Sequence, residues 1–173
     1  MEEFRKLYEE VYPDLYRMAY YYLGSAADAE DAVQDTALAA WKHFGGLKRK
    51  ESFRAWIFQI LVNICRKTLR GRGRHSSVSA APAEERQPAS APETNLAERL
   101  EILELLSILE EEERVIVLLS VFGGYKGVEI AGLLNRRHST IRSRYRRALK
   151  KLERELQEKE LQEKSRIQKE ESI

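Results

Sequence analysis

The sequence has few of the residues that catalysis, metal binding and disulfide formation require. Its single cysteine, Cys65, excludes a disulfide within the chain and favours a reducing compartment. The three histidines, His43, His75 and His138, are far apart and show no metal-ligand spacing. The sequence also contains no phosphate-binding glycine loop and no G-x-S-x-G nucleophile motif. We therefore expect a protein that is not an enzyme and that uses no metal or cofactor.

Long apolar segments are also lacking. No run approaches the roughly 20 apolar residues needed to cross a bilayer. The start, Met1-Glu2-Glu3, lacks the basic residues and apolar run of a signal peptide. These features predict a cytoplasmic protein without membrane insertion. The net charge is only +2, with 30 Lys and Arg against 28 Asp and Glu, so any case for nucleic-acid binding must come from how the charges are distributed.

Glycine and proline are scarce, whereas Leu, Ala, Glu, Lys and Arg dominate, which favours an all-α fold. Residues 76–94 hold three of the four prolines and no aromatic residue, and this composition predicts a flexible linker. Fully extended, such a linker would reach about 65 Å. The sequence thus predicts two small helical domains, residues 1–75 and 96–157, joined by residues 76–95. Residues 158–173 form a charged tail, expected to be a frayed helical extension or disordered.

Apolar residues at helical spacing predict three helices in the first domain. The first covers about residues 4–23, with Pro13 expected to kink or interrupt it. The second is capped by Ser25 or Asp28, ends near His43 and buries Trp41 among other residues. The third follows a basic loop and is expected to be capped by Ser52.

The second domain carries the strongest functional signal. Helices are expected at 96–109, 115–122 and 127–134, and a long helix begins near Ser139 after the turn 135–137. A short helix, a tight turn and a longer helix are typical of a helix-turn-helix. The long helix should bury Ile141, Tyr145, Ala148, Leu149, Leu152 and Leu156. Residues 136–151 include eight basic residues and no acidic one, and arginine suits phosphate and guanine recognition. An ordinary soluble helix face explains this density poorly.

A second basic surface is predicted on the third helix of the first domain. Its exposed stripe and the preceding loop include Lys48, Arg49, Lys50, Gln59, Asn63, Arg66, Lys67 and Arg70. Amide and aromatic groups, here Trp56, beside a basic groove suit unstacked single-stranded bases. Taken alone, Trp56 is better explained as a core residue, and the basic stripe also fits an ordinary exposed face.

The second helix begins with acidic residues, including Asp28, Asp31 and Asp35 around Gln34. Acidic residues near a helix N-terminus interact favourably with the helix dipole, which is one sufficient explanation. In a DNA-binding domain, however, an acidic face would repel DNA. It therefore favours contact with a basic protein partner.

In this order, the motifs resemble the extracytoplasmic-function (ECF) group of bacterial sigma factors. The segments DAEDAVQDTALAAWKHF and ESFRAWIFQILVNICRKTLR resemble region 2 of that group. The segment GYKGVEIAGLLNRRHSTIRSRYRRALKKLE resembles its region 4 helix-turn-helix. The resemblance covers about residues 4–75 and 96–157, and the two motifs in this order are far more specific than a lone helix-turn-helix.

The resemblance implies an alternative sigma factor that directs core RNA polymerase to promoters. Contact with the clamp coiled coil of the polymerase β′ subunit is implied for Asp28, Asp31, Gln34 and Asp35. Opening of the −10 element and capture of an extruded base are implied for Lys48, Arg49, Lys50, Ser52, Trp56, Gln59, Asn63, Arg66, Lys67 and Arg70. Reading of the −35 duplex is implied for Arg136, Arg137, His138, Ser139, Thr140, Arg142, Ser143 and Arg146. The polymerase β flap and an anti-sigma factor are further implied partners.

Some positions depart from the family pattern. Gly127 stands where an aromatic residue is common, and Asn135 replaces a turn glycine, which asparagine can do because it accepts a left-handed backbone. Two alternatives remain. A stand-alone helix-turn-helix regulator would leave the acidic helix and the first basic stripe unexplained. An adaptor or inhibitor that binds polymerase without touching DNA would leave the basic cluster of residues 136–151 unexplained.

Overall fold

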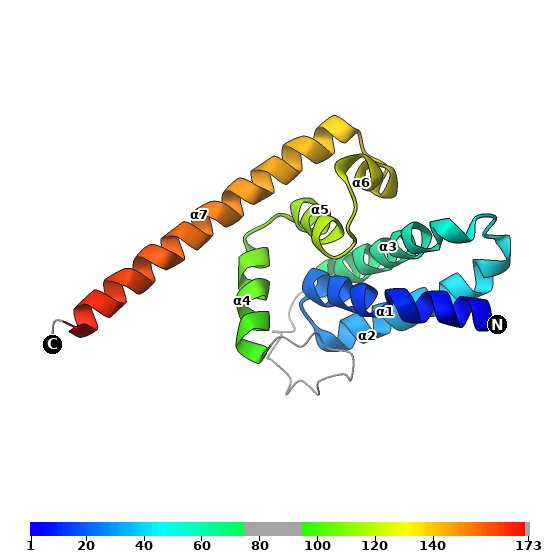
Figure 1. The fold of residues 1–173 in the computed structure, drawn as a ribbon, viewed down its shortest axis with the longest axis horizontal. Helices are drawn as coiled ribbons and strands as arrows, with labels where there is room; N and C mark the ends of the chain where they lie inside the picture. Colours follow the sequence, from blue (N-terminus) through cyan, green and yellow to red (C-terminus); the bar gives the residue numbers. More distant parts are fainter. Residues whose placement is uncertain (75–94, 172–173) are drawn as a thin grey trace.

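The computed structural model describes residues 1–74 and 95–171, and all regular secondary structure within them is helical. This confirms the all-α prediction. The first group of helices is α1 (Glu2–Leu23), α2 (Ala26–His43) and α3 (Phe53–Arg74), which pack against one another (Figure 1). Two short 3₁₀ turns, Phe44–Gly46 and Lys50–Ser52, join α2 to α3. The predicted linker, residues 76–95, lies outside the described residues except for Asn95.

Helix α1 continues through Pro13, so the interruption expected there as one of two outcomes does not occur. Pro13 and Glu9 are both exposed, and the Glu9 carbonyl that loses its helical donor is therefore open to water. Gly24 ends the helix in a left-handed conformation, with φ 70°. Ser25 then caps α2 as expected, because its Oγ accepts a hydrogen bond from the Asp28 N–H at 3.3 Å.

Aromatic rings close the end of this bundle where the chain begins. Phe4 lies edge-on to Trp41, Phe44 and Phe53, with ring centroids 5.2, 5.2 and 5.8 Å apart. Trp41 was predicted to be buried, but it is 45% exposed. It lies in the last turn of α2, where its ring meets Phe4 edge to face and the start of α1 covers it only in part.

The second group of helices is α4 (Leu96–Ser107), α5 (Glu111–Val121), α6 (Gly127–Leu134) and α7 (His138–Glu171). Asn95 caps α4, since its Oδ1 accepts from the Glu98 N–H at 2.9 Å. Helix α5 begins earlier than its apolar run because Glu113 accepts a hydrogen bond from the Glu110 N–H at 3.1 Å in a capping box. The charged tail is helical as far as residue 171.

The roll of α7 differs from the prediction. Ile141 and Ala148 are buried as expected, but Leu149 and Leu156 are each 45% exposed. The cause is electrostatic: Arg144 and Lys151, on the neighbouring stripe, pair with Glu112 and Glu113 of α5. These pairs turn the Arg144–Lys151 stripe toward α5 and leave the two leucines at the side.

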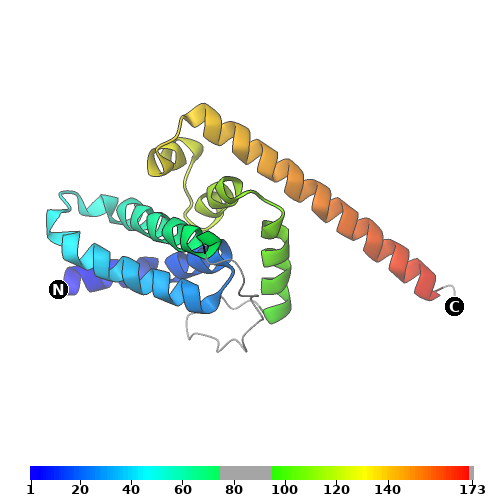
Figure 2. The same ribbon diagram turned by 180° about the vertical axis from the view of Figure 1, so that it is seen from behind.

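The two groups of helices lie against each other. Helix α1 contacts α4 and α5, and α3 contacts α6. In both ribbon views α5 lies next to α1 and α3, between the two groups (Figure 1, Figure 2). The part of α1 from Leu15 to Leu23 is therefore largely covered, although the Arg17 side chain stays partly exposed. Tyr16, Tyr20 and Tyr21 are buried there, although a helix with one apolar face would have left part of this set exposed.

Candidate nucleic-acid interface

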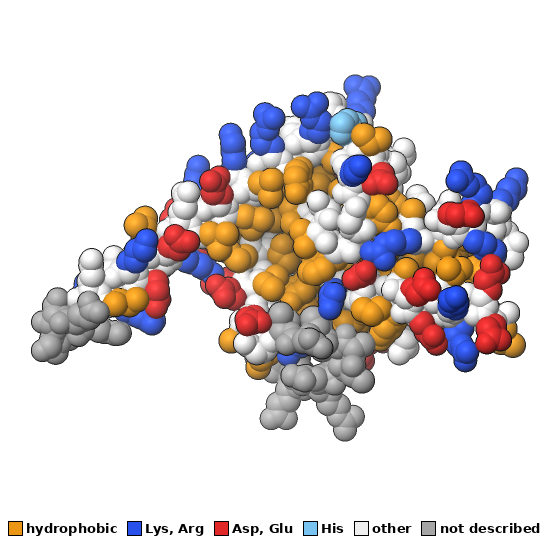
Figure 3. Space-filling view, in the orientation of Figure 1, with side chains coloured by type: hydrophobic (Ala, Val, Ile, Leu, Met, Phe, Trp, Pro, Cys, Tyr) orange, Lys and Arg blue, Asp and Glu red, His pale blue; other side chains and the backbone are white. Residues whose placement is uncertain are grey.

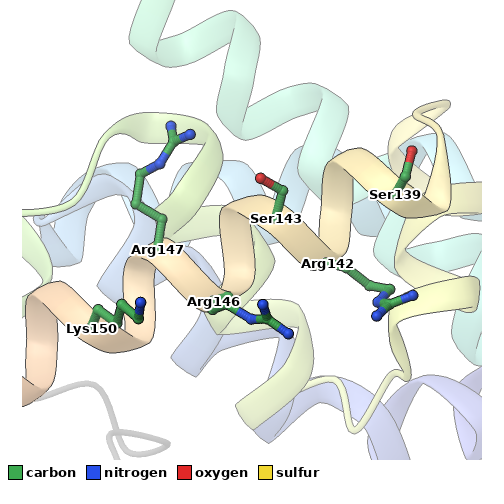
Figure 4. A pocket seen from close by; sticks show the side chains of 6 residues that line it. All are labelled: Ser139, Arg142, Ser143, Arg146, Arg147 and Lys150. Atoms are coloured by element: carbon green, nitrogen blue, oxygen red, sulfur yellow. The ribbon is translucent and has the colours of Figure 1, made fainter.

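The start of α7 presents a continuous basic face. A shallow groove along it is lined by Ser139, Arg142, Ser143, Arg146, Arg147 and Lys150, which follow one another along the helix (Figure 4). In the space-filling view, Lys and Arg side chains line the outer edge of α7 (Figure 3). Four positive charges on one exposed surface suit a polyanion better than a small apolar ligand.

The arginines predicted to lie on this face differ in whether they are paired with a carboxylate. Arg142 and Arg146 are exposed, and neither pairs with a carboxylate in the described part of the chain. Arg136 is already engaged, because its Nε lies 2.7 Å from Glu112 Oε1. Arg137, His138 and Ser139 are exposed, Ser143 likewise, and Thr140 is half-buried.

Glu112 of α5 organises the base of this face. Burial alone would raise the pKa of its carboxyl. The hydrogen bond from Arg136 and the charges of Arg144, Arg136 and Arg66 outweigh burial and lower that pKa below its ordinary value. The ionised carboxylate holds Arg136 of the turn and Arg144 of α7 together. No pattern in the sequence indicated this cluster of Glu112, Arg136 and Arg144, since Glu112 belongs to a separate segment of the chain.

The turn itself has the conformation that its sequence suggested. Asn135 adopts the left-handed conformation, with φ 51° and ψ 52°, and its N–H bonds to the Gly132 carbonyl at 3.3 Å. Gly127 has a local role as well: a Cβ there would lie 3.1 Å from Nε2 of His138. The missing side chain lets the His138 ring lie close to the start of α6 and so ties α6 to α7.

Helix α3 carries the second basic surface. Gln59, Asn63, Lys67 and Arg70 are exposed along one stripe of the helix. Arg66 is only half-buried and lies beside Tyr22, which donates a hydrogen bond to Glu111 of α5 at 2.9 Å. Burial and this carboxylate raise the pKa of Tyr22 well above its usual range, and the Arg66 guanidinium opposes the rise. Arg66 thus faces α5 rather than open solvent.

The loop before α3 also contains both exposed basic residues and residues that pack against the bundle. Lys48 and Arg49 are exposed, whereas the Lys50 ammonium lies 3.5 Å from the Phe44 ring centroid and 3.8 Å from Glu3. Ser52 and Trp56 are half-buried, and the Trp56 ring lies 6.0 Å from that of Phe53. Lys50 and part of Trp56 therefore belong to the packing of the bundle.

The acidic face of α2 is only partly free. Asp31, Gln34 and Asp35 are exposed. Asp28 is half-buried and pairs with Arg72, whose Nη1 also donates to the Leu23 carbonyl at 2.7 Å. Sequence reasoning did not include Leu38, which is 59% exposed and continues the same face together with Trp41. Its position seven residues after Asp31 was the available signal.

The described residues contain no cluster of His, Cys, Asp or Glu able to hold a metal ion. Nor does any helix among them have the length and apolar character that crossing a membrane requires.

The arrangement of two basic helices in separate helical groups has relatives of known type. Residues 7–75 match the family Sigma-70 region 2, and residues 99–152 match Sigma-70, region 4. ECF RNA polymerase sigma factor SigL of Mycobacterium tuberculosis is 34% identical over 161 residues, which is 89% of each chain. The chain belongs to the ECF group of sigma factors. This confirms the resemblance that its motifs suggested.

Other relatives of this sigma factor agree. SigM of Mycobacterium tuberculosis is 28% identical over 151 residues, covering 87% of this chain and 76% of the relative. Sigma factor RpoE in complex with the anti-sigma factor NepR from Bartonella quintana aligns with a TM-score of 0.72 and 26% identity, over 91% of this chain and 98% of RpoE. CnrH in complex with the cytosolic domain of CnrY shares the fold, with a TM-score of 0.68, 24% identity and coverage of 89% and 87%.

Proposed function

We propose that this sigma factor directs core RNA polymerase to promoters in which α7 reads a −35 duplex and α3 opens the −10 element. The observation that carries the proposal is the exposed basic face of α7. Its Arg142 and Arg146 are unpaired within the described residues and accompany two serine hydroxyls. An α-helix fits the major groove, where arginine can bond to O6 and N7 of guanine.

The contacts at −35 that we propose are Arg137, His138, Ser139, Thr140, Arg142, Ser143 and Arg146. Arg147 and Lys150 extend the same surface and suit the phosphate backbone where the helix leaves the groove. Arg136 has a mixed role, because Glu112 holds its Nε while the residue remains exposed. It supports the turn and leaves part of its guanidinium for a phosphate.

At −10, Gln59, Asn63, Lys67 and Arg70 are the exposed candidates on α3, joined by Lys48 and Arg49 of the preceding loop. Amides can bond to the edge of an unstacked base, and the cations neutralise the phosphates of a separated strand. Trp56 and Ser52, at the start of α3, would complete the binding site for the unstacked base. Lys50 and Arg66 take part only if they leave their present partners, Glu3 and the α5 carboxylates.

For polymerase binding, we assign the face of α2 that holds Asp31, Gln34, Asp35, Leu38 and Trp41 to the β′ clamp coiled coil. Exposed acids beside two exposed apolar side chains suit a basic amphipathic helix. Asp28 supports this face indirectly, because its carboxylate is paired with Arg72 at the junction of α1 and α2. The second group of helices would meet the β flap.

An anti-sigma factor is a further proposed partner. It is supported by the 0.72 TM-score alignment with RpoE, whose structure was solved with the anti-sigma factor NepR. Action with polymerase would place the protein in the cytoplasm. We propose no reaction of its own.

Promoter-dependent transcription with purified core polymerase tests the proposal. Adding the chain to core and a library of genomic fragments should produce transcripts from discrete start sites, each with a shared sequence near −35 and −10. Core alone is the control. If no start site depends on the chain while the chain binds palindromic duplexes as a dimer, it is a stand-alone regulator instead. If it binds core but makes every transcript disappear, it is an inhibitor.

A further inference from the structure

One acidic side chain contacts the basic segment of residues 136–151 at two points. Glu112 lies in the first turn of α5, and its Oε1 is 2.7 Å from Nε of Arg136 in the turn before α7. Its Oε2 accepts a hydrogen bond from Nη1 of Arg144, in the second turn of α7. Because the pKa of this carboxyl lies below its ordinary value, it is ionised at neutral pH. One carboxylate therefore holds two guanidiniums that come from different elements.

These elements have other contacts that hold them in place. The turn is closed by the Arg136 N–H, which donates to the Ala131 carbonyl at 2.9 Å. Helix α7 is joined to α5 by Lys151, whose Nζ lies 2.7 Å from the buried Glu113 carboxylate. The side chains of Arg136 and Arg144 are 50% and 33% exposed, and ion pairs open to water contribute little to stability. Stabilisation of the fold is therefore only a small part of what the first carboxylate does.

The carboxylate of Glu112 also decides how many cations are free to bind phosphate. Residues 136–151 hold eight basic residues and no acidic one. Free cations on such a segment bind the phosphates of any sequence, and each neutralised phosphate releases counterions. Arg144 lies four residues after Thr140 and three before Arg147, so it neighbours both at the edge of the proposed DNA-binding face. Released from Glu112, its guanidinium would add to the cations available there.

Additional phosphate contacts favour non-specific DNA over a promoter. In a specific complex, base contacts fix the orientation of α7 in the groove, so an arginine at the edge of the face meets a phosphate only where that orientation places one. A non-specific complex is not restricted in this way and can shift until each free cation meets a phosphate. Non-specific sites are present in large excess, so the ratio of the two affinities decides whether the promoter is found. An arginine that stays paired with a carboxylate protects this ratio.

We propose that Glu112 is a specificity-determining residue, which restrains Arg136 and Arg144 and thereby weakens sequence-independent binding of DNA more than binding to a −35 element. Arg142 and Arg146, which pair with no carboxylate within the part of the chain that the structure describes, remain free to meet bases. The claim about the −35 element rests on the proposed function. The restraint on non-specific binding rests on the two contacts of the carboxylate alone.

Binding of the full chain to duplex DNA of random sequence, measured by fluorescence anisotropy over a range of salt concentrations, tests this restraint. Glu112→Ala releases both guanidiniums. At a salt concentration of about 0.1 M, its affinity should be about three- to tenfold higher than that of the wild type, and the slope of log affinity against log salt should be steeper by about one to two. Glu112→Gln keeps one acceptor oxygen, so it should hold at most one guanidinium and give an intermediate slope.

Arg144→Gln shows whether the gain comes from a released cation. In the wild-type background it should leave the slope unchanged, because Arg144 is already paired with Glu112. Combined with Glu112→Ala, it should make the slope shallower by about one, because the released cation is gone. This dependence on the background measures the coupling of the two residues. A side chain that only supported the fold would not produce it.

Glu101→Gln is the charge-matched control. Glu101 is an exposed residue of α4 with no part in the proposed surfaces, and its loss changes the net charge by the same amount as Glu112→Ala. It should leave the salt slope on random DNA unchanged. Circular dichroism checks that each variant is folded. If Glu112→Ala has lost helix, Glu112→Gln, whose side chain has nearly the original size, takes its place.

The consequence for specificity is measured with holoenzyme on two duplexes that differ only at −35, one from a mapped promoter and one with that sequence scrambled. In Glu112→Ala the ratio of the two affinities should fall about three- to tenfold, mainly because the scrambled duplex binds more tightly. If Glu112 served only to support the helix-turn-helix, the promoter duplex would bind less tightly and the scrambled duplex would gain nothing.

Each result decides a separate point. An unchanged slope in Glu112→Ala and Glu112→Gln, or an equal effect of Arg144→Gln in both backgrounds, would overturn the restraint. A steeper slope with an unchanged ratio on the two holoenzyme duplexes would overturn the claim about specificity. If the wild-type holoenzyme prefers no −35 sequence at all, the proposed function fails, while the slopes on random DNA still decide whether Glu112 restrains the arginines.

Discussion

The buried carboxylate of Glu113 in α5 lies 2.7 Å from Nζ of Lys151 in α7. Burial alone would raise the pKa of Glu113, but the hydrogen bonds from Lys151 and the Glu110 N–H, and the charges of Lys151 and Arg147, lower it. This pair, together with that of Arg144 and Glu112, joins one stripe of α7 to α5, and the face that we propose for DNA lies on other sides of the helix.

We expect Glu113→Ala to lower the free energy of unfolding by about 2–4 kcal/mol. Breaking a fully buried ion pair costs about 3–5 kcal/mol. The expected loss is smaller here because about a third of the Lys151 side chain is exposed to water. A carboxyl whose folded pKa is lowered stabilises the protein above its unfolded pKa, and this contribution is lost as the pH falls through the folded value. Acid unfolding below the ordinary value of 4.5 should therefore be less steep in Glu113→Gln.

Chemical denaturation at several pH values from about 3 to about 7 spans the range in which carboxyl groups titrate. It measures the free energy of unfolding and how that free energy changes with pH. Glu104→Ala is the control, because Glu104 pairs with Lys159 at 2.8 Å but is 69% exposed, and a surface pair contributes little. An equal decrease in the free energy of unfolding in Glu113→Ala and Glu104→Ala would show that the buried pair does not hold α7 in place.

Arg142 and Arg146 are predicted to read the −35 element. Arg142→Ala and Arg146→Ala should each cost about 1–3 kcal/mol of promoter binding and relax the preference at one position if the side chain contacts a base. If it contacts only phosphate, all sequences should weaken alike and the salt slope should fall by about one. Titration of holoenzyme on a set of −35 variants at several salt concentrations measures both quantities.

Lys164→Ala is the matched control for this experiment, since Lys164 is an exposed cation of the same helix beyond the family match at residues 99–152. It should leave promoter binding unchanged. Unaltered binding by both arginine variants would mean that α7 is not the recognition helix.

Charge reversal on α2 should weaken polymerase binding. Asp31→Lys with Asp35→Lys places two cations on an exposed face that we expect to meet a basic surface, and like charges repel. Affinity for core polymerase, measured by titration, should fall while the circular dichroism spectrum stays the same. The decrease should be smaller at high salt.

Glu10→Lys, an exposed change on α1, controls for the altered net charge. Asp28 is not a suitable probe, because its loss would free Arg72 and disturb the junction of α1 and α2. A folded double variant that binds core polymerase like the wild type would remove this face from the proposal.

Sequence reasoning succeeded where structure is set locally. The bounds of α6, the left-handed Asn135 and the start of α7 follow from caps and turn residues within a few positions of one another. The exposed stripe Gln59, Asn63 and Lys67 follows from helical periodicity alone.

It failed where two distant segments meet. Tyr20 and Tyr21 are buried only because α4 and α5 cover α1. Arg136 and Arg66 looked equally free in the sequence, yet α5 carboxylates lie close to both. No pattern within α1, α3 or the turn encodes the position of α5.

The last prediction concerns strand opening at −10. Asn63 is exposed on α3 and carries an amide able to bond to an extruded base, a contact worth about 1–3 kcal/mol. Extruding a base from the duplex costs a few kcal/mol. The loss of Asn63 should therefore matter most where the duplex must still be opened. Asn63→Ala should impair transcription from closed duplex templates and recover much of its activity on templates with a mismatch bubble at −10.

Lys67→Ala provides the comparison on the same stripe of α3. If Lys67 neutralises phosphate, its loss should weaken both templates alike, because the phosphates are present in each. Trp56→Ala is a poorer probe, since Trp56 is half-buried against Phe53 and its removal would also destabilise the bundle. The measured quantity is the ratio of duplex to bubble transcription for each folded variant holoenzyme. A ratio in Asn63→Ala equal to that of the wild type would move the strand-opening role away from this part of α3.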